Sequence, residues 1–510
     1  MKPRAGPRGL ALVAALSALL VSCARTVPRD PGPSAGPAPA AVLFVTASLE
    51  GTLEPCGCSA ALRGGLARSA RVISDARAAN PHVTWIDAGN ALFPSDRSPS
   101  ELVRPQELAR AHTLAQAMTA MGLAARATGP LDRMGGDGAA PSAELPTLAS
   151  AEARRLSRAG AAVPLHVVTG ATDGALASAL ERTPPEPGAL VVALLPLGLE
   201  RALELAPVAL GIDLVVAAGP SPVGSNEGSR IVVQEGVPHV RLEGRGRALL
   251  RVDVAAPGPE KAGYRWQRGE DDLARELAAL DARIALLAEE LDRPGAPDDP
   301  LRPLKRSKAV ELQARRASLA SAPLPTLSPG HFSLRLVPVD PALPEEPRVA
   351  ALIRAHDAEV GALNLAWART HGEDCPEPAD GQATYVGNAA CLDCHPGAGA
   401  VWAATPHAHA WETLQALGKQ HHLDCIGCHV VGWQEPGGVC RLDRTEGRQD
   451  VGCESCHGPG SLHAEGGDAS LLRGRADESR CRTCHNAEHS PHFDFAGWLP
   501  RVLGPGHGRP

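Results

Sequence analysis

One short pattern recurs four times near the C-terminus and limits what this part of the chain can fold into. Cys-x-x-Cys-His occurs within residues 384–510 as CLDCH, CIGCH, CESCH and CRTCH, which begin at Cys391, Cys425, Cys453 and Cys481. We number these motifs 1 to 4 in chain order. The surrounding sequence is rich in Gly and Pro, and its apolar periodicity is weak. About 125 residues of this kind cannot build a core from side chains alone. Something else must therefore fill the interior.

The histidine at the end of each motif indicates which group this is. In c-type haem attachment, two thiols add to the two vinyl groups of a porphyrin, and the adjacent histidine binds the iron. Zinc sites and disulfides also use paired cysteines, but they do not require a histidine at this position every time. We therefore predict four covalently attached haems c. The attachment residues would be Cys391, Cys394, Cys425, Cys428, Cys453, Cys456, Cys481 and Cys484, and the proximal ligands His395, His429, His457 and His485.

The second axial ligand of each iron is expected to be a histidine. All four methionines lie before residue 135, so none within residues 384–510 can serve as a ligand. Bis-histidine ligation usually gives a lower reduction potential than Met/His ligation. The candidates are the eight other histidines of this segment: His407, His409, His421, His422, His463, His489, His492 and His507.

Four stretches of this segment carry a family resemblance: YVGNAACLDCH, VWAATPHAHAWETL, DVGCESCHGPGSLH and CRTCHNAEHSPHFDF. Together they resemble the multihaem cytochromes related to the tetrahaem cytochrome c of the hydroxylamine pathway. The resemblance implies His407 and His463 as distal ligands, and we take His489 and His507 as the next candidates. It also implies electron transfer between a donor and an acceptor redox protein.

The first residues predict export and membrane anchoring. Residues 1–22 combine a basic start with a 12-residue apolar run and end before Cys23 in LVSC. This resembles a bacterial lipobox, in which the cysteine is lipidated; a plain secretory signal is the alternative. Residues 23–41 are rich in Pro and Ala and would form a semi-rigid tether. We expect a lipoprotein on the periplasmic side of the inner or outer membrane, or on the cell surface.

Residues 42–260 have the pattern of an α/β domain. Apolar runs such as AVLFVTA, ALVVALLPLG and IDLVVAAG predict strands, and ELARAHTLAQAMTAMG and LPTLASAEARRLSRAG predict helices. Near-continuous apolar strands that alternate with helices are typical of a buried, largely parallel sheet.

The start of this domain, AVLFVTASLEGTLEPCGC followed by WIDAGNALF, resembles the 5′-nucleotidase-like metallophosphatases. The resemblance implies a four-layer α/β sandwich. These enzymes hold two metals that activate water. Here Ser48 and Glu50 stand where an Asp and a His are expected, and Asn90 replaces a further Asp. Asp87 and Asp132 remain, as two scattered carboxylates. We therefore expect a non-catalytic scaffold; a retained phosphatase or nucleotide-binding module is the competing hypothesis.

Residues 261–325 predict a coiled-coil helical hairpin. Leucine and isoleucine repeat at alternating steps of four and three between Leu273 and Leu291, which is an a/d seam. Its role would be that of a spacer or a dimer contact. Residues 326–383 follow as a connecting strand and helix that lead to the tetrahaem segment, 384–510.

Four cysteines lie outside the motifs and the lipobox. Cys56 and Cys58 could bind a soft metal, form a reducible disulfide, act as a redox relay or be inert. Cys375 and Cys440 could pair with each other. The net charge of −7 gives no reason to expect nucleic-acid binding.

These patterns together predict an electron-transfer cytochrome without substrate turnover of its own. The alternative is a multihaem reductase in which one haem keeps an open position for a small nitrogen or sulfur compound.

Overall fold

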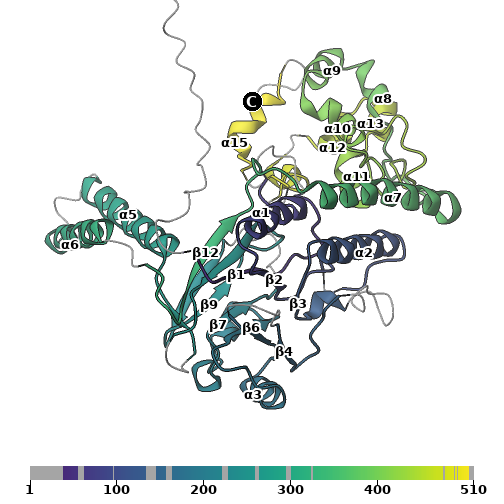
Figure 1. The fold of residues 1–510 in the computed structure, drawn as a ribbon. Coiled ribbons are helices and arrows are strands. Elements are labelled where there is room, and N and C mark those ends of the chain that lie inside the picture. Colours follow the sequence, from purple (N-terminus) through teal and green to yellow (C-terminus); the bar gives the residue numbers. More distant parts are fainter. Residues whose placement is uncertain are drawn as a thin grey trace, which may run out of the picture. The chain divides into compact units, whose positions relative to one another are not determined.

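Two six-stranded sheets form the framework of the α/β part in the computed structural model (Figure 1). The first has the order β11-β12-β10-β1-β2-β3. In it β1, β2 and β3 run parallel, while β10 joins β1 and β12 by antiparallel pairing. Its strands are β1 (Ala41–Thr46), β2 (Val83–Asp87), β3 (Ala125–Arg126), β10 (Ala248–Val254), β11 (Arg265–Trp266) and β12 (His331–Pro338).

The second sheet has the order β4-β5-β6-β7-β9-β8. Strands β5, β6, β7 and β9 are parallel, and both edge strands pair antiparallel to them. The apolar runs of β6 and β7 are buried along their whole length, as expected for parallel strands covered on both faces. The strands are β4 (Ala153–Arg155), β5 (Leu165–Val168), β6 (Leu190–Leu195), β7 (Leu214–Ala217), β8 (Arg230–Gln234) and β9 (Val237–Arg241).

The structure describes residues 38–55, 62–95, 97–133, 145–156, 163–220, 228–258, 263–293, 300–322, 326–474, 477–486, 489–490 and 492–504. The predicted export signal, Cys23, Cys56, Cys58 and His507 lie outside these residues. Residues 39–510 form one compact unit.

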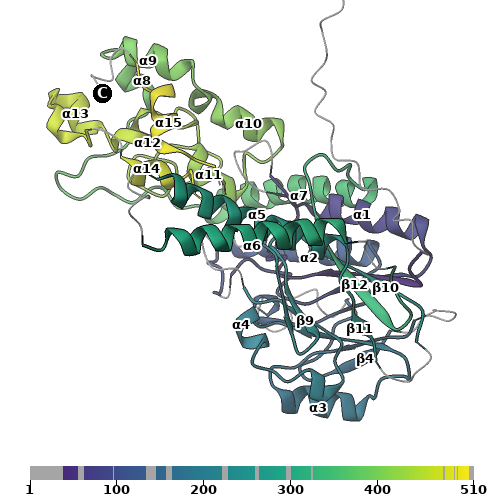
Figure 2. The same ribbon diagram turned by 90° about the vertical axis from the view of Figure 1, so that its left-hand side faces the viewer.

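The sheets stack face to face, with helices on both outer faces (Figures 1 and 2). One apolar cluster, which includes Leu43 and Val192, fills the space between the sheets. A second packs α1 (Leu66–Ala79), α2 (Arg104–Ala120) and α7 (Pro347–His371) on the first sheet, and a third packs α3 (Asp173–Arg182) and α4 (Leu199–Ala202) on the second. This arrangement confirms the expected four-layer sandwich.

One predicted helix is wrong. Within LPTLASAEARRLSRAG, the residues Ala153–Arg155 form strand β4 instead. They pair antiparallel with β5, and Ala153 lies opposite Val168. This pairing satisfies backbone groups at the sheet edge and buries Ala153, which outweighs the helical spacing of the apolar residues.

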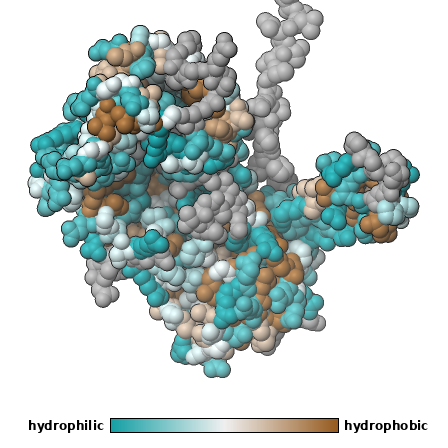
Figure 3. All heavy atoms as spheres, turned by 180° about the vertical axis from the view of Figure 1, so that it is seen from behind, coloured by the Kyte–Doolittle hydropathy of each residue, from teal (hydrophilic) through white to brown (hydrophobic). Residues whose placement is uncertain are grey.

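The helical hairpin forms as predicted. Helices α5 (Glu270–Asp292) and α6 (Arg302–Ser321) pack through Leu280, Leu287 and Leu312. Figure 3 shows hydrophilic and hydrophobic residues side by side on the surface of the hairpin. None of the helices among the described residues has both the length and the apolar character that a membrane crossing needs.

The haem segment is a chain of short helices joined by loops. A small apolar cluster links it to α7 through Ala368, Trp411, Ile426, Val430, Val439 and Leu442. Cys375 and Cys440 form a disulfide, with Cα atoms 5.2 Å apart, so the predicted pairing is confirmed. The helices are α8 (Asn388–Leu392), α9 (Pro396–Ala403), α10 (Ala410–Ala416), α11 (Leu423–His429), α12 (Cys453–His457), α13 (Ser461–Gly466), α14 (Glu478–Arg482) and α15 (Phe495–Trp498).

Candidate haem-binding site

Each Cys-x-x-Cys-His motif lies on a short helix or at its end. Motifs 2 and 3 lie within α11 and α12, and motifs 1 and 4 begin in α8 and α14 and continue just beyond them. A spacing of three residues on a helix places the two thiols on the same face. None of the eight motif cysteines forms a disulfide.

The motifs meet in pairs through their thiols. A hydrogen bond with Cys453 raises the pKa of Cys391, and the same contact lowers the pKa of Cys453 to about 7. A hydrogen bond with Cys428 lowers the pKa of Cys484 to about 6. Motif 1 therefore lies against motif 3, and motif 2 against motif 4.

Two of the motif histidines face a second imidazole. The ring centres of His395 and His463 are 6.1 Å apart, and their planes are inclined by 25°. The ring centres of His407 and His485 are also 6.1 Å apart, with an inclination of 45°. With metal–imidazole bonds of about 2 Å and a ring centre about 1.1 Å behind each nitrogen, two trans imidazoles have centres about 6 Å apart. The spacing therefore fits one iron between each pair.

The outer nitrogen of several of these imidazoles is held by the chain. The Nδ1 atom of His429 lies 2.7 Å from the Ala410 carbonyl oxygen, that of His457 3.2 Å from Gly474 O, and that of His463 3.1 Å from Asp468 O. A carbonyl oxygen can only accept, so each Nδ1 carries the proton. This leaves the Nε2 lone pair for a metal, as is usual for ligating histidines.

The structure separates the remaining candidate ligands. Burial is the main cause that lowers the pKa of His429, and the charge of His489 lowers it further. His489 therefore lies near His429. His409 has both ring nitrogens engaged, by Ala403 O at 3.3 Å and by Glu412 at 3.5 Å. His422 directs its Nε2 to the Asp357 carbonyl oxygen at 3.0 Å. We therefore do not take His409 as a ligand, whereas the contact of His422 engages only its Nε2.

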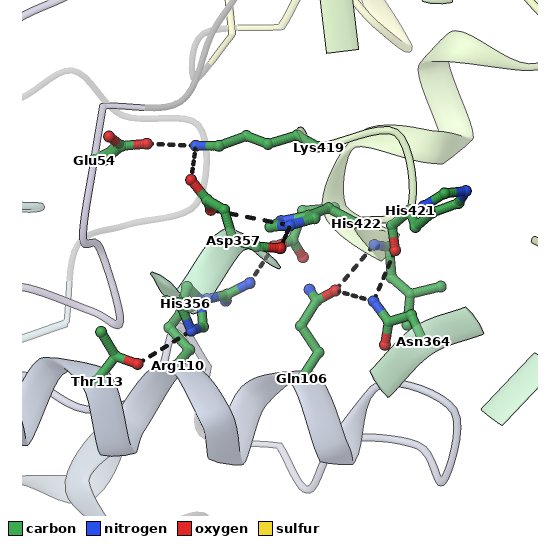
Figure 4. A network of polar contacts seen from close by, with 12 residues as sticks. Glu54, Gln106, Arg110, Thr113, His356, Asp357, Asn364, Lys419, His421 and His422 are labelled. Atoms are coloured by element: carbon green, nitrogen blue, oxygen red, sulfur yellow. Dashed lines mark hydrogen bonds and ion pairs between the residues drawn. The ribbon is translucent and has the colours of Figure 1, made fainter. Parts of the chain in front are cut away.

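The haem segment rests on helices α2 and α7, which we call the α2–α7 platform. Lys419, in the loop before motif 2, forms ion pairs with Glu54 and with Asp357, the latter at 3.5 Å (Figure 4). His422 bonds to the backbone of the same Asp357. Because Asp357 is largely buried, its carboxyl needs this cation; burial raises the pKa of Asp357 and Lys419 opposes that rise.

A second set of contacts fixes the start of α11 on the platform. The buried Asn364 amide donates to Gln106 Oε1 and to the His421 carbonyl oxygen, both at 2.8 Å. Gln106 Oε1 also accepts the Leu423 backbone N–H at 3.0 Å. The His421 ring points away from this network in Figure 4. The helix that carries motif 2 is thus held at its first turn by side chains of the α/β part.

Asp87 ends strand β2 and Arg126 ends strand β3, so both lie at one edge of the first sheet. The two remaining carboxylates are not scattered, as the sequence suggested, but lie around the buried guanidinium of Arg126. Arg126 forms an ion pair with Asp132 and lowers the pKa of Asp87, which burial nevertheless raises to about 7. Strand β3 supplies Arg126 and pairs parallel with β2, which places Arg126 opposite Asp87.

Backbone groups complete this edge. The Asp132 carboxylate accepts N–H groups from Asn90 at 2.8 Å, Ala91 at 2.9 Å and Gly129 at 2.8 Å. The Asn90 side chain accepts from Leu131 N at 3.0 Å and donates to the Ala218 carbonyl oxygen. No three His, Cys, Asp or Glu side chains are grouped as metal ligands in the described part of the chain.

Residues 390–458 match the protein-family model described as cytochrome c554 and c-prime. The C-terminal part of the chain resembles cytochrome c554. A curated relative, cytochrome c-554 of Nitrosomonas europaea, is 32% identical over 143 residues, which cover 21% of this chain and 61% of that protein. The chain thus spans less than two thirds of this relative. The residues that match the family model, 390–458, include motifs 1, 2 and 3.

Two solved structures, both of proteins from Thermus thermophilus, cover more of the chain at lower similarity. A sulfate thiohydrolase, SoxB, solved in complex with glycerol, is 14% identical and has a TM-score of 0.38. The match covers 67% of this chain and 63% of the thiohydrolase chain. A 5′-nucleotidase precursor is 14% identical with a TM-score of 0.36, and the coverages are 63% and 59%. The assignment of the four layers rests on the sheets and helices described above.

Proposed function

We propose that this chain is an exported, lipid-anchored tetrahaem cytochrome c that passes electrons between redox proteins. The observation that carries the proposal is the pairing of His395 with His463 and of His407 with His485 at the spacing of two ligands on one iron. The similarity of residues 390–458 to cytochrome c554 supports it.

In this proposal the motif cysteines would hold the porphyrins, and histidines would bind each iron. His395 and His463 would hold one iron, and His407 and His485 a second. His489 is assigned to the iron of His429, and His507 is the remaining candidate for that of His457. The haems would supply reversible one-electron chemistry. The chain's own part is to orient the imidazoles through their Nδ1 protons.

The other parts would support this electron transfer. Residues 1–22 would direct export, Cys23 would carry the lipid, and 23–41 would be the tether. The α/β part, 42–260, would be a non-catalytic scaffold, and its helix α2, together with α7 of the 326–383 segment, would form the platform that holds motif 2. The hairpin, 261–325, would be a spacer or dimer contact, and 326–383 would connect it to the haem segment. The carboxylates at this edge of the first sheet are already used by Arg126 and by backbone N–H groups, which supports a scaffold.

The proposal is tested on the purified full-length protein. Intact mass and the pyridine haemochrome spectrum should give four haems per chain, and reductive titration should take up four electrons reversibly. A count below four, or zinc in place of haem, would contradict the proposal. Turnover of a small nitrogen or sulfur compound together with a five-coordinate haem would instead favour the reductase.

A further inference from the structure

Glu454 is a buried carboxylate inside a haem-attachment motif. It lies between Cys453 and Cys456 in motif 3 and is 2% exposed. An ionised carboxylate is costly to bury unless hydrogen bonds or a cation compensate it. Here the compensation comes from two segments, one before motif 1 and one after motif 3.

Backbone N–H groups surround this carboxylate. Oε1 accepts from Val386 N at 2.9 Å and from Gly460 N at 2.8 Å. Oε2 accepts from Gly387 N at 2.7 Å and from Val386 N at 3.1 Å. Such charge-assisted hydrogen bonds are shorter and stronger than neutral ones. Both oxygens are thus used, and each joins motif 3 to another part of the haem segment.

The two segments bound by Glu454 lead to the two ligands of one iron. Val386 and Gly387 immediately precede α8, where motif 1 begins, and Gly387 adopts a positive φ of 84°. Gly460 precedes α13, which carries His463. The backbone turns sharply between motif 3 and Gly460 at Gly458, whose φ is 80°. Glu454 therefore binds the backbone just before the helix in which motif 1 begins, and also the backbone just before the helix that carries His463.

Further hydrogen bonds join the start of motif 1 to motif 3 and to α13. Asn388, in motif 1's helix, accepts the Cys453 N–H at 2.9 Å. Ser461, in the helix of His463, exchanges two hydrogen bonds with Thr384: its hydroxyl accepts at 2.9 Å and its N–H donates at 3.1 Å. Motif 1, motif 3 and α13 are in this way one hydrogen-bonded unit.

We propose that Glu454 is a positioning residue that sets His463 opposite His395 across the iron of motif 1. This rests on the proposed function. The role requires a carboxylate because four N–H contacts converge on two oxygens, whereas a glutamine offers one oxygen and turns an NH₂ group toward backbone N–H groups. Without the carboxylate, Gly460 N would lose its hydrogen-bond acceptor, and the helix that carries His463 would no longer be fixed at its start.

The test compares Glu454→Gln with Glu446→Gln in the full-length, haem-loaded protein. Glu446 is an exposed glutamate of the same segment, so it controls for the change in charge. We expect Glu454→Gln to keep its covalent haems but to convert one low-spin haem to high-spin in EPR and resonance Raman spectra, and free imidazole to restore the low-spin signal. Glu446→Gln should match the wild type.

A double variant makes the test specific to His463. If Glu454 acts through His463, Glu454→Gln in a His463→Ala background should cause no further loss of low-spin haem. An additive loss, or a fully low-spin Glu454→Gln protein, would overturn the inference while leaving the proposed function intact. If wild-type protein itself lacks low-spin haem, the proposed function fails instead.

A second substitution covers the case in which Glu454→Gln does not load haem. Glu454→Asp keeps the charge but cannot reach all four N–H contacts, so we expect a partial conversion of one haem to high spin. A Glu454→Asp protein whose spectra match the wild type would also overturn the inference.

Discussion

His395 and His463 face each other with ring centres 6.1 Å apart, although one ends motif 1 and the other follows motif 3. The stretch CESCHGPGSLH therefore contributes to two sites. In the proposed assignment, its cysteines and His457 would hold one haem, and His463 would bind the iron of another.

Replacing His463 with alanine should free one axial position on the haem of motif 1. We expect one high-spin haem per chain, a higher midpoint potential for that haem and unchanged attachment at all four motifs, because the cysteines are untouched. Resonance Raman spectra with and without added imidazole measure this. His409→Ala is the matched control, since both of its nitrogens are used by the protein. A change in the haem held by Cys453 and Cys456 would contradict the assignment.

The ion pair between Lys419 and Asp357 should stabilise the contact between the platform and the haem segment. Lys419→Met leaves the largely buried Asp357 carboxyl without its cation, and we expect a loss of about 2 kcal/mol in the free energy of unfolding. Lys308→Met is the control, because Lys308 pairs with Glu311 on the exposed hairpin, where such pairs contribute about 0.5 kcal/mol or less. Denaturant unfolding monitored by haem absorbance measures both. Equal effects of the two substitutions would contradict a structural role for Lys419.

His356 should make the protein less stable in mild acid. Burial is the main cause that lowers its pKa from 6.5 to about 4, and nearby Arg110 adds to it. The unfolded chain therefore binds a proton at His356 between pH 6.5 and 4 that the folded chain does not, so stability falls as the pH falls through this window. The contribution is of the order of 3 kcal/mol at most.

The variant His356→Gln should flatten this part of the stability curve while keeping a polar partner for Thr113, which lies 3.2 Å from Nδ1. His371→Gln, at the exposed end of the same helix, should leave the curve unchanged. A slope between pH 6.5 and 4 that is equal in all three proteins would show that His356 does not cause it.

Arg126 should be essential to the stability of the α/β part. Its guanidinium is fully buried and paired with Asp132, so Arg126→Met leaves the Asp132 carboxylate with its backbone N–H partners but without its cation, at a cost of about 3 kcal/mol. The pKa of Asp87 should rise further, because Arg126 now lowers it. Thermal unfolding of Arg126→Met against the exposed Arg133→Met tests this. Similar stability of the two variants would contradict the role given to Arg126.

The features that local patterns determine were predictable from the sequence. The a/d spacing between Leu273 and Leu291 predicts α5, which the structure confirms. The attachment residues indicated by the recurrence of His after Cys-x-x-Cys stay a prediction. Features made by contacts distant in sequence were not predictable. Glu454 is one of two variable positions between the motif cysteines, and only the fold brings the N–H groups of Val386 and Gly460 to it. Strand β4 and the ion pair of Lys419 with Glu54 were missed for the same reason.

The most direct measurement of the central claim is the axial ligation of the haems in the purified protein. Low-temperature EPR, with spins counted against covalently bound haem, reports how many irons are low-spin with two histidine ligands. We expect all four irons to be low-spin and resonance Raman spectra to show six-coordinate irons throughout. A five-coordinate, high-spin population in the intact wild-type protein would contradict this expectation.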